Sequence, residues 1–149
     1  MSHHFSYTEM RGLFFGRKIG EGSTRKVFAC RIDESVVIKK EMKAGGFQNV
    51  LEWEIWRTVS YSETLAPWFA PCFHLSGSGT LLIQARTSPI ATLKDLPKKI
   101  PSFFTDLKKQ NWGWYEGRPV CHDYATISIK YFSEPIKMVK ADWWHEKGH

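Results

Sequence analysis

The chain has 149 residues, a net charge of +6, and 42% hydrophobic and 24% charged residues, which suits one folded domain and excludes a disordered or fibrous chain. The three widely spaced cysteines, Cys30, Cys72 and Cys121, argue against a disulfide framework or a zinc site and predict reduced thiols in a cytoplasmic protein. Because no run approaches the about 20 apolar residues of a membrane span, we expect no membrane association.

The first part of the chain predicts an antiparallel sheet that follows a loose lead-in over residues 1–12. Runs of β-branched and aromatic residues alternate with Gly, Ser and Asp turns, which is typical of consecutive short strands. The predicted strands cover residues 14–20, 27–32, 35–41, 73–76 and 81–86. We therefore expect a five-stranded antiparallel sheet with a single helix inserted after its third strand.

That helix is predicted over residues 47–60. Leu51, Ile55 and Val59 recur at four-residue spacing and define one apolar face. Glu52 lies on the flank of this face, where a buried carboxylate needs a positively charged or hydrogen-bonding partner. The alternative is a solvated glutamate, because the outer faces of helices are usually charged.

The second part of the chain predicts fewer regular elements. Residues 87–101 are rich in loops, and a hairpin is expected over 112–122 around the turn Glu116-Gly117. A final helix is predicted to begin at Ser133, which would cap it. The apolar stripe of this helix would consist of Ile136, Val139 and Trp143. The order of the elements indicates an α+β fold.

Two features of the predicted sheet suit a phosphate-bearing ligand. Gly20 and Gly22 lie in the turn between the first two strands, where glycines allow the backbone to approach phosphate oxygens, and Val27 would pack on a purine base. Lys39 closes an apolar strand, and Glu52 on the next helix is a carboxylate that would pair with it. Taken alone, a plain hairpin turn and a surface lysine are the alternatives.

A third motif lies in the second part of the chain. The run Asp106-Leu107-Lys108-Lys109-Gln110-Asn111 is followed by the predicted hairpin and then by Asp123. Phosphoryl transfer from a metal-bound nucleotide uses a carboxylate near the attacking hydroxyl and oxygen ligands for Mg²⁺. Asp106, Asn111 and Asp123 provide these groups, and the hairpin would bring Asp123 back beside Asn111.

In this order the motifs resemble those of the protein kinase-like superfamily. The matching elements are Gly20-x-Gly22-x-x-Arg25-x-Val27, Val37-Ile38-Lys39, Glu52-x-x-Ile55-Trp56, Leu81-Leu82-Ile83 with a hinge at 84–86, Asp106-Leu107-Lys108-x-x-Asn111 and Asp123-Tyr124-Ala125. The resemblance implies one domain over 1–149, with a nucleotide lobe at 14–86 and a reduced catalytic-loop lobe at 87–149 that ends in a helix. Small bacterial and phage proteins include such truncated kinase-like chains.

The resemblance also implies ATP and Mg²⁺ as ligands. ATP would be bound by Gly20, Gly22, Val27, Lys39, Gln84, Ala85 and Arg86, the last three through their backbone. Lys39 would hold the α and β phosphates and pair with Glu52. Asp106 would accept or orient the acceptor hydroxyl, and Lys108 would steady the γ-phosphate. The metal would be ligated by Asn111 and Asp123. The expected reaction is phosphotransfer, with a serine or threonine of a protein as acceptor.

The chain also departs from the family pattern. Arg25 replaces the third glycine of the turn, Phe104-Thr105 replaces the usual His-Arg pair, and Ala125 replaces the last glycine of the triplet. Only 24 residues follow Ala125, which leaves no room for a helical substrate platform. A missing lobe would expose apolar surface for a protein partner or for a second copy of the chain.

These departures keep two other functions open. One is a pseudokinase that binds a host protein as a regulator or inhibitor without transferring phosphate. The other is single-stranded nucleic-acid binding, because lysines lie near aromatic residues. The residues concerned are Lys98, Lys99, Lys108, Lys109, Trp112, Trp114 and Tyr115. Nucleic-acid binding is the less favoured of the two.

Overall fold

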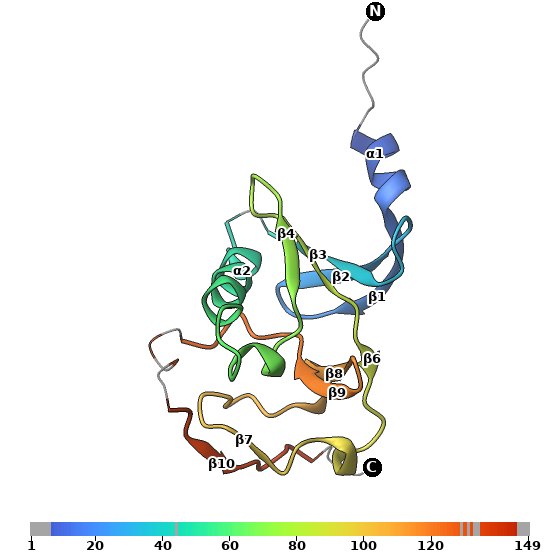
Figure 1. Cartoon of the computed structure of the whole chain (residues 1–149). Helices are drawn as coiled ribbons and strands as arrows, with labels where there is room; N and C mark the ends of the chain where they lie inside the picture. The colour runs from blue at the N-terminus through green and yellow to red at the C-terminus, as the bar shows by residue number, and fades with distance from the viewer. Residues whose placement is uncertain (1–6, 44, 129, 131, 133–134, 146–149) are drawn as a thin grey trace, which may run out of the picture. The chain divides into compact units, whose positions relative to one another are not determined.

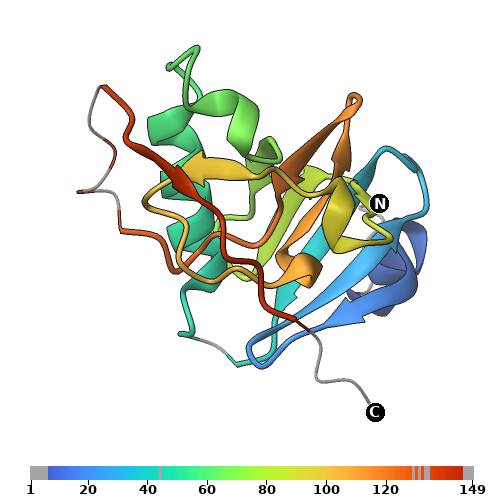
Figure 2. The ribbon, with the colours of Figure 1, turned by 90° about the horizontal axis from the view of Figure 1, so that it is seen from below.

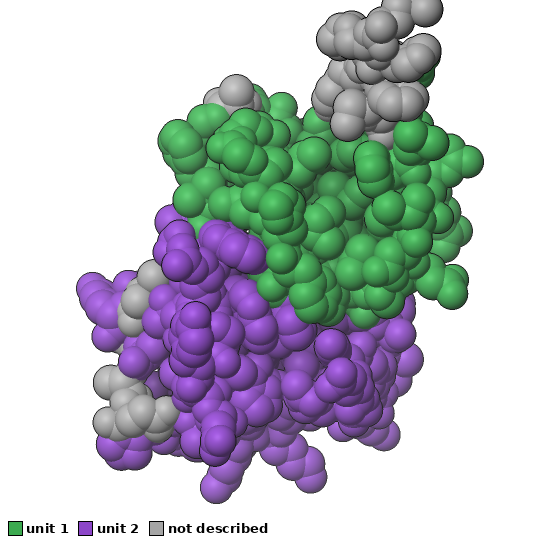
Figure 3. All heavy atoms as spheres, turned by 45° about the horizontal axis from the view of Figure 1, so that its top comes forward, with its two compact units in different colours: residues 1–50, 72–86 green, residues 51–71, 87–149 purple. Residues whose placement is uncertain are grey.

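The computed structural model describes residues 7–43, 45–128, 130, 132 and 135–145. The chain forms two compact units, which are coloured separately in Figure 3. Unit 1 comprises residues 1–50 and 72–86, and unit 2 comprises residues 51–71 and 87–149. Within the part of the chain that the structure describes, no helix is long and apolar enough to cross a membrane.

Unit 1 is built on a five-stranded antiparallel sheet with the order β1-β2-β3-β5-β4 (Figure 1). Its strands are β1 (Phe15–Glu21), β2 (Arg25–Cys30), β3 (Val36–Glu41), β4 (Cys72–Leu75) and β5 (Leu81–Ala85). The expected α+β class and five-stranded antiparallel sheet are therefore confirmed. Apolar side chains set the register, because successive residues of a strand point to opposite faces of the sheet.

The two faces of this sheet have different characters. On one, which we call the Ile38 face, Ile38 lies opposite Phe28 on β2 and Ile83 on β5. On the other, the Lys39 face, Lys39 lies opposite Val27 and Leu82. The Ile38 face carries an apolar cluster of Phe28, Cys30, Val36 and Ile38, with Phe15, Leu81 and Ile83 packed against it.

A short helix, α1 (Tyr7–Phe14), precedes the sheet where the sequence predicted a loose lead-in. Eight residues are too few for a stable isolated helix, so the helix depends on tertiary contacts. The Arg11 guanidinium lies 5.3 Å from the centroid of the Phe15 ring, and Arg31 donates a hydrogen bond of 2.7 Å to the carbonyl of Gly12. These contacts are not visible in the local sequence pattern.

The second helix, α2 (Gln48–Val59), starts in unit 1 and continues in unit 2. Its buried stripe differs from the predicted one, because Leu51 is 47% exposed whereas Glu52 is fully buried. Glu52, Ile55 and Val59 share the buried face at spacings of three and four residues. The prediction that Leu51 lies on the buried face of the helix was wrong. Glu52, whose carboxylate has a hydrogen-bond partner, takes the buried position instead.

Unit 2 contains two small sheets and an aromatic core. The three-stranded sheet has the order β6-β8-β9, and the two-stranded sheet pairs β10 with β7. Its regular elements are η1 (Ala66–Trp68), β6 (Ser88–Pro89), η2 (Leu93–Asp95), β7 (Lys99–Pro101), η3 (Lys109–Asn111), β8 (Trp112–Tyr115), β9 (Arg118–Cys121) and β10 (Met138–Lys140). Stacked and edge-to-face rings fill the space between them, from Phe69, Phe103, Phe104, Trp112, Tyr124 and Trp143.

The predicted C-terminal helix is wrong over the described residues 135–145; Ser133, its predicted cap, lies outside the described residues. The chain instead forms β10, which runs antiparallel to β7, as the red and yellow arrows show in Figure 2. The amide of Ala141 donates to the carbonyl of Lys98, and Trp143 Nε1 donates to the carbonyl of Pro97, at 2.8 Å each. Pairing with an otherwise unpartnered strand therefore outweighs the helical spacing of the apolar residues.

Candidate functional site

The glycine turn of unit 1 lies between β1 and β2. Gly20 is opposite Val27, and the amide of Gly22 donates to the carbonyl of Arg25 at 2.9 Å. Neither glycine has a positive φ, and a Cβ atom on either would meet nothing closer than 3.7 Å. The local fold therefore does not require glycine at these two positions. Another reason for glycine at these positions would be a close approach of the backbone to a ligand.

Lys39 and Gln84 both point to the Lys39 face of the sheet. Lys39 is 4% exposed on β3, and Gln84 is fully buried on β5, opposite Val37. The Gln84 side chain donates to Cys72 Sγ at 3.6 Å, while its Oε1 is buried without a hydrogen-bond partner among the described residues. A buried acceptor without a donor is costly, so a ligand N–H at this point would be stabilised.

The expected backbone contacts to adenine involve residues 84–86. Gln84 and Ala85 lie inside β5, which pairs with strands on both sides, and the amide of Arg86 donates to the carbonyl of Ser35 at 2.8 Å. The amide of Arg86 is therefore used by the connection that follows the sheet. Among the described residues of this segment, Gln84 also has a buried side-chain oxygen without a hydrogen-bond partner, for which the sequence did not single it out.

A buried polar network, absent from the sequence-based expectations, lies beside Lys39. Asn49 is fully buried in the first turn of α2, where its Nδ2 donates to the carbonyls of Lys39 and Thr80 at 2.9 Å each. Its Oδ1 accepts a hydrogen bond of 3.1 Å from the Arg25 guanidinium, and its amide donates to Glu41 Oε1 at 2.6 Å. The network joins two strands to the start of the helix and holds the backbone at Lys39.

In unit 2, a buried carboxylate holds the segment that follows the hairpin. Glu52 Oε1 accepts a hydrogen bond of 2.7 Å from the amide of Tyr124, and the Tyr124 hydroxyl donates to the carbonyl of Ala70 at 2.8 Å. Both residues are fully buried. Asp123 is exposed and directly precedes Tyr124. The hydrogen bonds of Tyr124 to Glu52 and Ala70 therefore also fix the backbone of Asp123.

The hairpin of β8 and β9 returns the chain to the loop that precedes it. The turn has positive φ at both Glu116 (49°) and Gly117 (78°), as a two-residue turn of type I′ requires. At its base the amide of His122 donates to the carbonyl of Asn111 at 2.8 Å. His122, the residue before Asp123, therefore lies against Asn111, whereas the predicted placement of Asp123 itself beside Asn111 stays a prediction.

The loop at 106–111 presents one free carboxylate and one amide. Asn111 Nδ2 donates to the carbonyl of Asp106 at 3.3 Å, which orients the amide, and its Oδ1 accepts no hydrogen bond from the described residues. The Asp106 side chain is exposed. Carboxylate and amide oxygens are ligands that Mg²⁺ takes together with phosphate oxygens, and Asp106, Asn111 and Asp123 offer oxygens of these kinds.

Two lysines of this loop have partners within unit 2. Lys108 Nζ lies 5.3 Å from the centroid of the Trp144 ring, and the Trp144 amide donates to the carbonyl of Leu107 at 2.9 Å. Lys109 Nζ donates to the carbonyls of Ile90 and Ala91 at 3.3 Å each. The C-terminal segment therefore covers part of the loop, and a phosphate contact by Lys108 would compete with a cation–π contact.

The His122 ring lies between two segments of unit 2. Its Nε2 lies 2.7 Å from the carbonyl of Gln110, which only accepts, so this nitrogen carries a proton. Its Nδ1 lies 2.7 Å from the Thr87 hydroxyl. The ring therefore links the loop at 106–111 to Thr87, a role that the sequence did not indicate.

Clusters of three or more His, Cys, Asp or Glu residues with metal-binding geometry do not occur within the described ranges. No protein-family model matches the sequence, and no curated protein matches it significantly. A Mg²⁺ ion held by one or two side chains and a nucleotide does not need such a cluster.

Proposed function

We propose that the chain is an ATP- and Mg²⁺-dependent phosphotransferase of protein kinase-like type, with a serine or threonine hydroxyl of a protein as acceptor. The observation that carries the proposal is the loop of unit 2. There Asp106 is exposed, Asn111 is tied to the Asp106 carbonyl, and the hairpin returns the chain so that Asp123 follows a residue bonded to Asn111.

Unit 1 supports the same function through its sheet. The resemblance implies a five-stranded antiparallel sheet with one helix after the third strand for a nucleotide lobe, and unit 1 has such a sheet with α2 between β3 and β4. Gly20 and Gly22 leave the backbone of the turn open to phosphate oxygens. Lys39 supplies a nearly buried ammonium, and Gln84 supplies an acceptor for a donor of the base.

In this proposal the residues act mainly by positioning and by electrostatics, as is general for phosphoryl transfer. Mg²⁺-bound ATP supplies the transferable phosphoryl group. Asp106 orients the acceptor hydroxyl and takes its proton, while Asn111 and Asp123 offer oxygen ligands to the metal. Lys39 offsets the charge of the non-transferred phosphates. Glu52 fixes the backbone next to Asp123 through the amide of Tyr124.

The experiment that tests the proposal uses γ-labelled ATP with Mg²⁺ and a mixture of peptide acceptors that contain serine and threonine. We expect label transfer by the wild-type chain and losses of at least 100-fold in Asp106→Asn and Asp123→Asn, as general acid–base and metal-ligand groups usually give. Asp142→Asn, an exposed acid of unit 2 outside the loop, is the matched control. Transfer that persists in both site variants would refute the assignment.

A second candidate function is a pseudokinase that binds another protein. The observation that favours it is the C-terminal segment, because Trp144 bonds to the backbone of Leu107 and stacks on Lys108. A loop covered in this way has less room for an acceptor. Stabilisation of the fold by ATP and Mg²⁺ without label transfer would favour this function over catalysis.

Nucleic-acid binding receives less support from the structure. Trp112, one of the aromatic residues that would stack on bases, is 2% exposed within the aromatic core of unit 2. Lys109 donates to two backbone carbonyls. This function would be supported if a labelled oligonucleotide bound the chain with an affinity that falls steeply as the salt concentration rises.

A further inference from the structure

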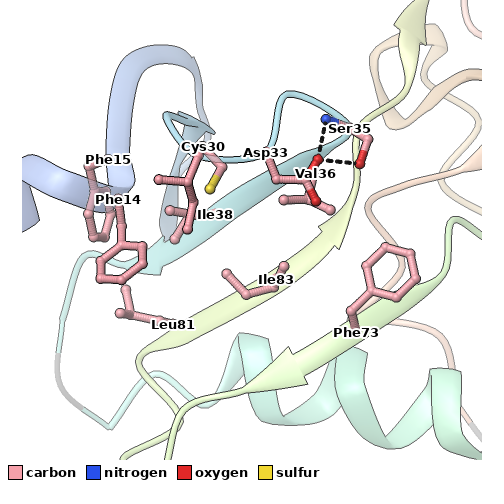
Figure 4. Close-up of a pocket in the computed structure, with 11 residues that line it drawn as sticks. Phe14, Phe15, Cys30, Asp33, Ser35, Val36, Ile38, Phe73, Leu81 and Ile83 are labelled. Carbon is pink, nitrogen blue, oxygen red and sulfur yellow. Dashed lines mark hydrogen bonds between the residues drawn. The ribbon is translucent and has the colours of Figure 1, made fainter.

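The Ile38 face of unit 1 carries an apolar groove with a volume of about 580 Å³ (Figure 4). Its floor is formed by side chains of the central strands, including Ile38 and Ile83, and Phe14 and Phe73 lie at its sides. The complete lining is Phe14, Phe15, Cys30, Ile32, Asp33, Ser35, Val36, Ile38, Phe73, Leu81 and Ile83. The groove lies on the opposite face of the sheet from Lys39, so it is separate from the residues assigned to ATP.

The rim of the groove exposes large apolar side chains. Ile32 is 68% exposed, Phe73 is 53% exposed and Phe14 is 40% exposed. A contiguous apolar patch on a protein surface usually marks a place where another molecule docks. A small ligand seated in the hollow would leave the outward surfaces of these residues in water. A polypeptide segment that lies along the groove would cover them.

One acidic side chain, that of Asp33, gives one end of the groove a negative charge. Asp33 is the only ionisable carboxylate or amine among the lining residues. Ser35 donates to Asp33 Oδ1 from both its hydroxyl and its amide, as the dashed lines in Figure 4 show. Among the described residues, no donor bonds to Oδ2. These bonds, the side-chain one first, hold the pKa of Asp33 below its usual range, so the carboxylate is charged at neutral pH.

The length of the groove limits what can occupy it. Along β3 it extends from the level of Lys40, opposite Leu81, to Val36, opposite Ala85. This is about 13 Å at the usual rise of a strand, which corresponds to about four extended residues or about nine helical ones. The space and its lining suit two large side chains, with a positive charge at the Asp33 end.

We propose that this groove binds a segment of another protein that carries two large apolar side chains with a lysine or arginine on one side of them. The apolar side chains fill the hollow over Ile38 and Ile83 and cover Phe73, and the cation bonds to Asp33 Oδ2. Such a site is independent of phosphotransfer, because none of its residues belongs to the ATP or Mg²⁺ set. It would give the chain a way to select a protein partner or substrate.

The test is a selection of random dodecapeptides displayed on phage against the wild-type chain, with removal of peptides that also bind Phe73→Ser. The Phe73 ring is half exposed on the edge strand β4, so its replacement spares the core. We expect the remaining peptides to share two large apolar residues with a lysine or arginine at a fixed position on one side of them. An acidic consensus, or no peptide that distinguishes the two proteins, would overturn the proposal.

Point variants then test the charge. For a synthetic peptide of the selected consensus, measured by fluorescence polarisation, Asp33→Asn should weaken binding about two- to fivefold, as expected for a rim ion pair. Phe73→Ser should weaken it at least tenfold. Glu34→Gln, an exposed neighbour that does not line the groove, is the matched control and should bind as wild type. Equal effects of Asp33→Asn and Glu34→Gln would overturn the assignment of the cation.

A second copy of the chain is the competing occupant. Sedimentation equilibrium of the wild-type chain and of Phe73→Ser distinguishes it, because a copy that occupies the groove would produce a dimer that the variant loses. A monomer at the concentrations of the peptide assay is the expected result. A dimer that depends on Phe73 would overturn the proposal of a foreign segment.

Discussion

Replacement of Asn49 by alanine should destabilise unit 1 more than any conservative surface change. The Asn49 side chain is fully buried and makes three hydrogen bonds, two as donor to the carbonyls of Lys39 and Thr80 and one as acceptor from Arg25. Alanine removes all three and leaves two buried carbonyls without these donors. Hydrogen bonds to a charged group, such as that from Arg25, are the stronger ones.

The size of the effect follows from these contacts. Each neutral hydrogen bond contributes about 1 kcal/mol and the bond to the guanidinium about 2 kcal/mol, so Asn49→Ala should cost about 3–5 kcal/mol. This is a large part of the about 5–15 kcal/mol by which domains are usually stable. Asn49→Asp keeps an acceptor for Arg25 but places an oxygen against two carbonyls. We therefore expect it to be destabilising as well, although it has the same shape.

Urea denaturation followed by circular dichroism measures these changes, with amide hydrogen exchange at Lys39 and Thr80 to localise them. Gln48→Ala is the matched control, because Gln48 is the preceding helix residue and its side chain makes no hydrogen bond to the described residues. We expect it to change stability by less than about 0.5 kcal/mol. Wild-type stability in Asn49→Asp, or a loss in Asn49→Ala no larger than in Gln48→Ala, would refute the role of the network.

Three further effects are expected. Tyr124→Phe removes the buried hydrogen bond to the Ala70 carbonyl and should lower the free energy of unfolding by about 1 kcal/mol in urea, with no loss of apolar burial. Gly117→Ala places a Cβ atom at a φ of 78° and should cost about 1 kcal/mol by the same measurement. Ser35→Ala removes the bond that chiefly lowers the pKa of Asp33, so an NMR titration should show this pKa rising towards its usual value. Because the lowered pKa stabilises the fold above the unfolded-state pKa, and this stabilisation is lost as the pH falls through the folded-state pKa, the variant should lose less stability on acidification.

The sheet of unit 1 could be predicted from the sequence because its signals are local. Val36, Val37 and Ile38 form a continuous β-branched run, Gly-containing turns separate β1 from β2 and β4 from β5, and an Asp-Glu-Ser turn separates β2 from β3. The structure shifts the ends of the strands by one or two residues, which is normal where bonding at strand ends is incomplete. The turn at Glu116-Gly117 was equally readable, because glycine favours the positive φ that a tight hairpin requires.

The parts that were missed depend on distant partners. The C-terminal segment has apolar residues at helical spacing, yet it forms β10 because β7, some 40 residues earlier in the chain, offers an unpaired edge. Helix α1 depends on contacts of Arg11 and Arg31 with rings and carbonyls outside its own sequence. Asn49 carries no motif at all, since an asparagine at the start of a helix usually suggests only a cap.

Arg25 illustrates how a departure from a family pattern can have a structural cause. In the resemblance it replaces a glycine of the phosphate-binding turn, which argues against nucleotide binding if the side chain fills the turn. In the structure it is 6% exposed, lies opposite Glu41 and donates to Asn49, at the end of β2 beside the start of α2. A guanidinium held in this way needs that network to offset its desolvation, so its position is determined by the fold. The turn itself retains Gly20 and Gly22, where a Cβ atom would meet nothing closer than 3.7 Å, and the case for a phosphate-bearing ligand therefore rests on those two residues and Lys39.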